Sequence, residues 1–435
     1  MRPHGLLLAI LSSVAVASSV KPEVDVDNNA LLERRGLIGG LLKDLTLVTS
    51  TILPTTISAA IGSLSNIAAL QPTSLIDLAT NLVEAGLAAD KLADVIDFVQ
   101  GFAGEENSMN NTNEREPESS IYPLAGSEDA PYSIPEAQLR AAIHIPATFR
   151  YGDGVQPIVL VPGTGNTGYT SFAGNFIPLL VNSSVADPVW LNIPGYLNGD
   201  SQLNAEYVAY AINYISSITN QKIAVGAWSQ GGFITQWATK YWPSIRSQIT
   251  DIVAFSPDYK GTTISNLITN LDVPFPRSYY QQAFNSSFVS ALRAGGGDSA
   301  YVPTTTVHSG LFDVIVQPQS GTEASAFLRD ERGVGVSNHE VQEICSGQPA
   351  GGYYGHAGVL YNLITYALLV DALSHEGPGR VERISEDVCE DYLTAGLNLA
   401  SLKLTENAIV LSAVTLLLEG GPPVTGEPTV RDYAL

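Results

Sequence analysis

Short β-branched runs alternate with longer helical patterns along the chain from residue 156 onward. The runs predicted as buried strands are 157–161, 188–193, 222–227, 249–255 and 302–308. Between them, 202–218 and 231–241 repeat apolar residues every three or four positions, as amphipathic helices do. Strands separated by helix-length segments require crossover connections. The pattern therefore predicts an α/β fold, with a mostly parallel central sheet covered by helices on both faces.

The chain ahead of residue 131 follows a different pattern. Arg2 precedes an apolar run that ends in small residues, which is typical of a secretion signal, and the dibasic pair Arg34–Arg35 is typical of a processing site. A helical period then runs through 75–102. The predicted divisions are a signal peptide over 1–17, a short pro-segment over 18–35, a helical N-terminal region over 36–104, an exposed acidic linker over 105–130 and the α/β domain over 131–435. The sequence leaves open whether the helical region is an inhibitory or chaperoning pro-segment or a packed accessory piece.

Composition and charge argue against nucleic acid as a partner and indicate a folded, secreted protein. The formal net charge is −22 and no basic run is present, so nucleic acid would be repelled. Hydrophobic residues make up 45% of the chain and charged residues 15%, which predicts a large buried core. After the signal, no apolar run reaches the roughly 18 residues of a transmembrane helix. Glycosylation triplets at Asn110, Asn182 and Asn285 agree with a secreted, extracellular glycoprotein.

The chain has two cysteines, Cys345 and Cys389. In an oxidising compartment such a pair usually bonds, and two cysteines allow a single intramolecular pairing. No histidine lies near enough in sequence to suggest a ligand cluster, so no metal site is expected.

The sharpest local signal is Ala-Trp-Ser-Gln-Gly-Gly at 227–232, between a predicted strand and a predicted helix. A serine on such a turn is exposed above the sheet, and small neighbours let strand and helix pass closely. Ser229 is therefore the candidate nucleophile, and the backbone N–H of Gln230 would point at a developing oxyanion. Ala227 replaces the first glycine of the usual pattern. The alternative is an ordinary turn serine.

A second strand end, Val-Pro-Gly-Thr-Gly at 161–165, precedes the nucleophile where the other oxyanion donor normally lies. Thr164 could give both its N–H and its hydroxyl to one oxyanion. The alternative is a phosphate-binding loop, but no lysine follows in the required position and no dinucleotide spacing is present.

A nucleophilic serine on this turn is followed along the chain by an acid and then a histidine. His356 lies in the flexible loop Gly-His-Ala-Gly at 355–358, just before a predicted helix, and is the candidate base. The other histidines precede the serine, lie in a predicted strand, or lie in charged stretches: His4, His144, His308, His339 and His375. Asp313 follows the strand ending near residue 308 and has apolar neighbours, so it needs a partner such as an imidazole. Asp330 is the competitor, in a cluster that is typical of a solvated surface.

Together these segments resemble the fungal lipase B family over roughly residues 155 to 390. The blocks that carry the resemblance are Leu-Val-Pro-Gly-Thr-Gly (160–165), Trp-Ser-Gln-Gly-Gly (228–232), Trp-Pro-Ser-Ile-Arg-Ser (242–247), Ser-Pro-Asp-Tyr-Lys-Gly (256–261), Ile-Val-Gln-Pro-Gln (315–319) and His-Ala-Gly (356–358). The resemblance implies an α/β-hydrolase fold, no cofactor and hydrolysis of carboxylic esters, including triacylglycerols. It also implies Ser229, Asp313 and His356 as nucleophile, acid and base, with Thr164 and Gln230 as the oxyanion hole.

The resemblance further implies pocket residues. Trp228 and Ser171 would line a small alcohol-side pocket, while Asp258, Gln282 and Ile315 would border the acyl channel. Cys345 and Cys389 match one disulfide of the family, and the partners of its other bridges are missing.

The chain departs from the family at several positions beside the triad. Gly355 stands where the family has an aspartate before the histidine, and Val314 where it has an acid after the catalytic aspartate. The long N-terminal region has no counterpart in the type enzyme of the family. The segment 262–276, where a lid would lie, also differs, so interfacial activation does not carry over.

The sequence thus predicts a secreted lipase whose substrate is an ester or lipid, met in solution or at a lipid–water interface. The alternatives are a carboxylesterase that is not a lipase, or an acyltransferase, with the same triad. A third is a secreted binding protein on a degenerate hydrolase scaffold. Because an ordinary imidazole titrates near pH ~6.5, hydrolysis should fade below about pH 6 if His356 is the base.

Overall fold

The computed structural model describes residues 53–72, 74–88, 104–263, 265, 275–418, 424 and 426–435. The signal peptide and pro-segment predicted over 1–35 lie outside the described residues.

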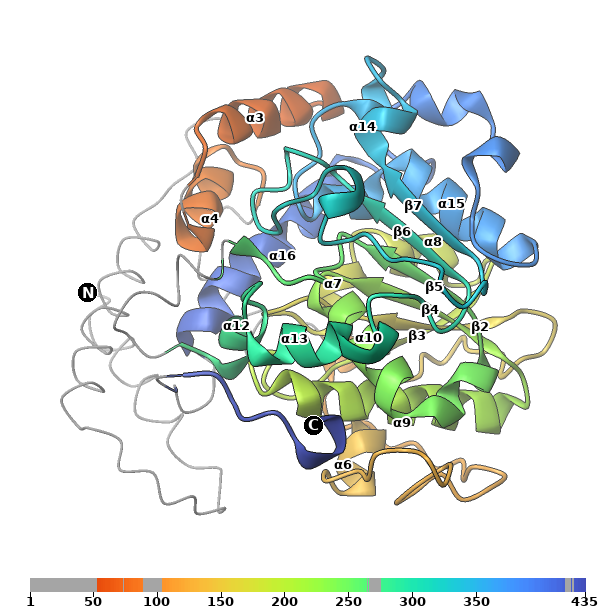
Figure 1. The fold of residues 1–435 in the computed structure, drawn as a ribbon. Helices are drawn as coiled ribbons and strands as arrows, with labels where there is room; N and C mark the ends of the chain where they lie inside the picture. The colour runs from red at the N-terminus through yellow and green to blue at the C-terminus, as the bar shows by residue number, and fades with distance from the viewer. Residues whose placement is uncertain are drawn as a thin grey trace, which may run out of the picture.

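A seven-stranded sheet runs through the middle of the described part of the molecule (Figure 1). Its order is β1-β3-β2-β4-β5-β6-β7; β1 pairs antiparallel with β3 and every other pair is parallel. The strands are β1 Ile143–His144, β2 Pro157–Val161, β3 Asp187–Leu191, β4 Ile223–Trp228, β5 Ile249–Phe255, β6 Thr304–His308 and β7 Val336–Glu340. The predicted mostly parallel α/β-hydrolase sheet is confirmed.

Helices cover both faces of the sheet. They are α3 Ile57–Ala69, α4 Leu75–Glu84, α6 Glu136–Ala141, α7 Gly168–Phe172, α8 Phe176–Leu180, α9 Ser201–Thr219, α10 Gln230–Tyr241, α12 Arg277–Gln281, α13 Ser287–Arg293, α14 Val341–Ile344, α15 Leu363–Ser374 and α16 Leu399–Leu418. Short 3₁₀ turns connect them: η3 Glu105–Asn107, η4 Pro243–Gln248, η5 Ala294–Gly296, η6 Gly321–Glu323, η7 Pro349–Gly351, η8 Gly358–Tyr361, η9 Val381–Arg383, η10 Glu386–Cys389 and η11 Asp432–Ala434.

The pleat of the strands divides the core into two layers. In β2, Ile158 and Leu160 face one cluster of buried residues, while Val159 and Val161 face the other. The first cluster contains side chains of α4, α15 and α16, and the second contains side chains of α9, α10 and α13. Because both faces are buried, the central strands are continuous apolar runs, as expected of a parallel sheet.

The helix α16 is long, and most of its residues are apolar. Its residues 399–416 would be long and apolar enough to cross a membrane, but 67% of that window is buried inside the molecule. Val410 and Ala413 are fully buried in the same cluster as the sheet. In this structure α16 therefore packs as a core helix.

The helices α3 and α4 fall in the N-terminal region for which helices are predicted. Thr56 and Ser74 cap them by accepting hydrogen bonds from backbone N–H groups of their first turns. Leu78 and Leu82 of α4 are buried in the cluster that contains α16, and α4 lies beside α16 in Figure 1. The N-terminal helices are thus packed against the α/β domain.

The segment 105–130, predicted as an exposed linker, contacts the α/β domain at several points. The indole N–H of Trp190 donates to the Glu106 carbonyl at 2.8 Å, and the Tyr214 hydroxyl donates to the Arg115 carbonyl at 2.7 Å. These hydrogen bonds from buried side chains of the domain hold segment 105–130 against its surface.

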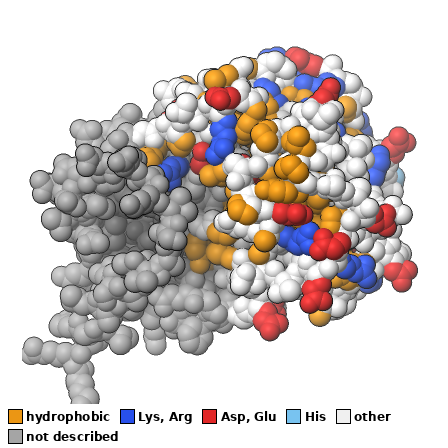
Figure 2. All heavy atoms as spheres, turned by 90° about the horizontal axis from the view of Figure 1, so that it is seen from below, with side chains coloured by type: hydrophobic (Ala, Val, Ile, Leu, Met, Phe, Trp, Pro, Cys, Tyr) orange, Lys and Arg blue, Asp and Glu red, His pale blue; other side chains and the backbone are white. Residues whose placement is uncertain are grey.

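The face seen from below, where α6 lies in Figure 1, has hydrophobic side chains spread among acidic and basic ones (Figure 2).

The disulfide between Cys345 and Cys389 is present, with the two Cα atoms 5.3 Å apart. It joins the end of α14 to the end of η10.

Candidate active site

Ser229 lies on a sharp turn between β4 and α10. Its φ and ψ are 55° and −127°, a conformation that non-glycine residues adopt only under local constraint. The Ser229 N–H donates to the Phe255 carbonyl, and the Ser229 carbonyl accepts from the Gly232 N–H, both at 2.9 Å. The turn is thus held by the neighbouring strand and by the first turn of α10. Ser229 is 5% exposed and lines a cavity.

Two glycines allow this turn to pack. A Cβ added at Gly231 would lie 2.5 Å from the Val161 carbonyl oxygen, and one at Gly232 would lie 2.6 Å from the Pro257 Cβ. Ala227, which replaces the usual first glycine, is fully buried. The structure therefore accommodates a methyl group at that position but none at 231 or 232.

Asp313 and His356 are joined by a hydrogen bond of 2.7 Å between Oδ2 and Nδ1. The other carboxylate oxygen of Asp313, Oδ1, accepts from the backbone N–H groups of Ile315 and Val316, at 3.0 and 2.9 Å. Asp313 is fully buried. Both oxygens thus have fixed partners, which sets the orientation of the carboxylate.

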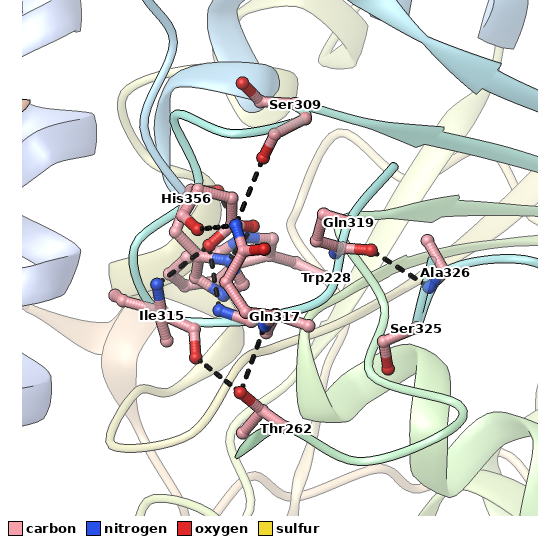
Figure 3. Close-up of polar contacts among 12 residues, drawn as sticks. Trp228, Thr262, Ser309, Ile315, Gln317, Gln319, Ser325, Ala326 and His356 are labelled. Atoms are coloured by element: carbon pink, nitrogen blue, oxygen red, sulfur yellow. Dashed lines mark hydrogen bonds and ion pairs between the residues drawn. The ribbon is translucent and has the colours of Figure 1, made fainter. Parts of the chain in front are cut away.

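The loop that follows Asp313 is held by Thr262 (Figure 3). The Thr262 hydroxyl donates to the Ile315 carbonyl at 2.9 Å and accepts from the Gln317 N–H at 3.1 Å. The Gln317 side-chain amide donates to the Asp313 carbonyl and to the Gly310 carbonyl. These contacts tie the loop to the segment after β5.

His356 is 4% exposed, and its carbonyl accepts from the Trp228 indole N–H at 3.1 Å. Within the described residues its Nε2 has no hydrogen-bond partner. Both His356 and Ser229 line the same cavity. Catalytic hydrogen bonds often form fully only when substrate is bound, so this arrangement is compatible with proton transfer between them.

A chain of side-chain hydrogen bonds surrounds Thr164. The Gln230 amide donates to the Thr164 hydroxyl at 3.1 Å, and that hydroxyl donates to the Gln282 side-chain oxygen at 3.0 Å. Asn204 donates to the Gln230 side-chain oxygen at 3.2 Å. The two predicted oxyanion residues are thus in direct contact. The Thr164 hydroxyl would have to rotate away from Gln282 to reach an oxyanion.

The loop that carries Thr164 is supported by α16. Ser412 donates to the Thr164 carbonyl at 2.7 Å, and Thr415 donates to the Gly165 carbonyl at 2.9 Å. Gly165 has φ 76°, and a Cβ there would lie 2.4 Å from the Ser412 Cα. These contacts join residues about 250 positions apart, so no local sequence pattern could reveal them.

A cavity of about 230 Å³ lies in front of these groups. The predicted residues that line it are Thr164, Trp228, Ser229, Gln282, Ile315 and His356. Further residues, not predicted from the sequence, complete the wall: Pro72, Ser74, Leu75, Leu78, Thr262, Ser265, Tyr279, Val314, Val316, Ile409 and Ser412. Leu75 and Leu78 of this wall come from α4, and Ile409 and Ser412 come from α16. The helical period over 75–102 predicts a helix where α4 begins but not where it docks, and no helix was predicted at α16.

Two residues predicted for the pocket do not line the cavity. Ser171 is fully buried in α7, and its hydroxyl accepts from the Gly163 N–H at 3.4 Å. Asp258 is fully buried after β5, and within the described residues neither carboxylate oxygen has a hydrogen-bond partner. Burial raises the pKa of Asp258 to about 7. The resemblance to the family implied that both border the pocket, but both side chains are fully buried.

Within the described residues, no group of three or more His, Cys, Asp or Glu side chains could hold a metal ion.

Comparison with known proteins identifies clear relatives. No family model matches the chain. The chain is 33% identical over 282 residues to lipase B of Pseudozyma antarctica, an alignment that covers 64% of this chain and 79% of that protein. The crystal structure of Aspergillus fumigatus lipase B matches with a TM-score of 0.83 and 42% identity, covering 99% of this chain and 100% of that one. The second match spans nearly the whole chain.

Proposed function

Because the chain belongs to the lipase B family of α/β-hydrolases and is a carboxylic ester hydrolase, we propose that it cleaves esters, including those of triacylglycerols, through an acyl-enzyme on Ser229. The observation that carries the proposal is the 2.7 Å hydrogen bond between His356 Nδ1 and Asp313 Oδ2, beside a cavity that His356 shares with Ser229.

In the proposed reaction, His356 takes the Ser229 proton at Nε2 while Oγ attacks the ester carbonyl. Asp313 keeps the proton on Nδ1 and stabilises the imidazolium. The imidazolium then protonates the leaving alcohol. Water, activated by the same histidine, attacks the acyl-enzyme and releases the acid.

Thr164 and Gln230 are proposed to hold the oxyanion of each tetrahedral intermediate. Each such donor is worth about 3 kcal/mol when removed. The contact between their side chains supports this assignment, since it holds the two residues next to each other.

The cavity wall supports an apolar acyl group as the bound portion of the substrate. Leu75, Leu78, Ile315 and Ile409 are all among its lining residues. Apolar walls with a few convergent polar groups are typical of sites for small apolar ligands.

We further propose that the chain is secreted and glycosylated. Asn110, Asn182 and Asn285 are all exposed, which glycosylation requires, and the disulfide is compatible with an oxidising compartment. Sequencing the N-terminus of protein collected from a culture medium tests the proposed cuts after residues 17 and 35. Recovery of uncleaved protein inside the cells alone would contradict secretion.

The catalytic proposal is tested with p-nitrophenyl butyrate and p-nitrophenyl palmitate. We expect Ser229→Ala to lose hydrolysis of both esters. Ser256→Ala is the matched control, because Ser256 is also buried, also has a positive φ and also follows a central strand. It should retain activity.

The same assay separates the alternatives. Cleavage of palmitate supports a lipase, and cleavage of butyrate alone supports a carboxylesterase. Preferential transfer to an added alcohol supports an acyltransferase. Full activity in folded Ser229→Ala would contradict the proposed nucleophile, and inert wild type would favour a binding protein.

A further inference from the structure

A second carboxyl group lies in the surroundings of His356. Glu406, on α16, is 3% exposed, and the Tyr361 hydroxyl donates to its Oε1 at 2.8 Å. Tyr361 is fully buried and ends η8, the turn that begins two residues after His356. The hydrogen bond thus connects α16 directly to the turn that follows the proposed base.

Glu406 and His356 also line one small cavity of about 30 Å³. Most of the remaining wall is apolar or aromatic: Leu64, Ile67, Ala68, Pro72, Leu78, Leu82, Phe312, Val314, Tyr353, Tyr354 and Ile409, with Gly355 beside His356. Charges in such surroundings are screened far less than at the surface. A carboxylate here therefore interacts effectively with a nearby imidazolium.

We propose that Glu406 is a positioning residue for the triad: held by Tyr361, its carboxylate stabilises the imidazolium that forms when His356 takes the Ser229 proton. The inference rests on the role proposed for His356. Glu406 contacts neither the substrate cavity nor Ser229 in the described structure, so it would act through the histidine alone.

Val314 follows Asp313 and Gly355 precedes His356, and both are uncharged residues that line the small cavity together with Glu406. Among the described residues that line this cavity, Glu406 on α16 is the one carboxylic acid.

Three carboxyl groups from different elements interact with His356: Asp313, from the loop after β6, by a hydrogen bond, and Asp258, after β5, and Glu406, on α16, through their charges. Burial raises the pKa values of Tyr354 and Tyr361, which lie on either side of His356 in the chain, so both hydroxyls stay neutral. Burial raises the pKa of Glu406 to about 7, while the Tyr361 hydrogen bond and the nearby histidine act in the opposite direction.

Glu406 therefore gains its proton near neutral pH, so its charge changes within the pH range of the assay. Attraction favours the state in which the histidine holds the proton and Glu406 stays ionised. Wild-type activity should consequently fall at a higher pH than it would without Glu406.

The test is the pH profile of kcat/KM for p-nitrophenyl butyrate between pH 4 and 9. We expect Glu406→Gln, which keeps an acceptor for Tyr361, to move the midpoint of the acid limb down by about 0.5 unit or more. We also expect kcat at pH 8 to fall about 3- to 10-fold, because the imidazolium loses stabilisation. The matched control is Glu206→Gln: Glu206 is also fully buried, but it accepts from the Ser133 and Ile134 N–H groups.

A rescue variant separates charge from structure. A Cβ at Gly355 would meet no atom within 4 Å, so Gly355→Asp is sterically open. In the Glu406→Gln background, Gly355→Asp should return the acid limb toward its wild-type midpoint. If Glu406→Gln does not fold, Tyr361→Phe gives the same readout, since losing its donor neutralises Glu406 over a wider pH range.

An unchanged acid limb in a folded Glu406→Gln or Tyr361→Phe enzyme would overturn the inference. A shift of the same size in the acid-limb midpoint of Glu206→Gln would also overturn the inference. His356→Asn distinguishes this failure from failure of the proposed function: if that variant stays active, the triad itself is wrong. If His356→Asn is inactive while the acid limb of the kcat/KM profile is unchanged in Glu406→Gln, only the proposed role of Glu406 is wrong.

Discussion

Replacing Asp313 by asparagine changes the triad with little change of shape. Its Oδ1 accepts from the Ile315 and Val316 N–H groups, and its Oδ2 faces His356 Nδ1 at 2.7 Å. In Asp313→Asn the side-chain oxygen must stay with the two backbone donors, which need an acceptor. The amide NH₂ then faces Nδ1 and forces that nitrogen to accept.

The consequence is the wrong histidine tautomer. With Nδ1 accepting, the neutral imidazole carries its proton on Nε2 and cannot take the proton of Ser229. A triad blocked in this way loses about 10⁴-fold in kcat, which corresponds to about 5.5 kcal/mol of transition-state stabilisation. Folding stability should change by only about 1–2 kcal/mol, because both backbone donors keep their acceptor.

The assay is kcat and KM for p-nitrophenyl butyrate at pH 8, together with the melting temperature. Asp330→Asn is the matched control, since the Asp330 carboxylate also accepts from two backbone N–H groups, at 2.8 and 3.0 Å, but is exposed. It should keep wild-type kcat. An Asp313→Asn enzyme within tenfold of wild-type kcat would refute the reasoning.

Two further predictions concern the wall of the site and its buried acid. Leu78→Ala should cost about 2–3 kcal/mol of stability and, by widening the cavity, raise the palmitate-to-butyrate ratio of kcat/KM about threefold or more. Leu82 lies on the same helix and lines the cavity of about 30 Å³ but not the substrate cavity, so Leu82→Ala should leave the palmitate-to-butyrate ratio unchanged. The same ratio in Leu78→Ala, Leu82→Ala and wild type would show that α4 has no part in selectivity. For Asp258, a folded-state pKa of about 7 lies above the unfolded value of ~3.9, so the stability linked to its proton is present below about pH 4 and is lost as pH rises through about 7. Asp258→Asn should therefore raise the melting temperature by a few degrees at pH 8 and by much less at pH 4.5, and the reverse order in a calorimetric comparison would contradict this.

The sheet was predictable because its central strands are buried on both faces. Each strand predicted at 157–161, 188–193, 222–227, 249–255 and 302–308 appears with ends within two residues of the prediction. The sequence did not indicate β1, which has two residues, or β7, whose Val-Ser-Asn-His-Glu run is only half-buried. Short or polar edge strands lack the apolar signal on which such predictions depend.

The polar residues of the site were predictable because chain order restricts them. Ser229 lies on a strand-to-helix turn, Asp313 follows a strand that comes after that serine in the chain, and the structure brings Asp313 and His356 together. Their roles remain proposals. The wall from α4 and the support from Ser412 were not predictable, since they depend on how distant helices dock.

Ser171 and Asp258 were predicted for the pocket but do not line the cavity. The resemblance to the family implied that both border the pocket, yet both side chains are fully buried in the structure. Glu406 could not be found from the sequence either, because it is one glutamate on a mostly apolar helix, 50 residues after His356.

The measurement that tests the central claim most directly is covalent trapping of the nucleophile. The enzyme is incubated with diethyl p-nitrophenyl phosphate, a reagent for activated serines, and the modified peptide is identified by mass spectrometry. The account predicts one label per chain, on Ser229, with matching loss of esterase activity and much slower labelling of His356→Asn. A label on another residue, or full esterase activity with Ser229 completely labelled, would contradict it.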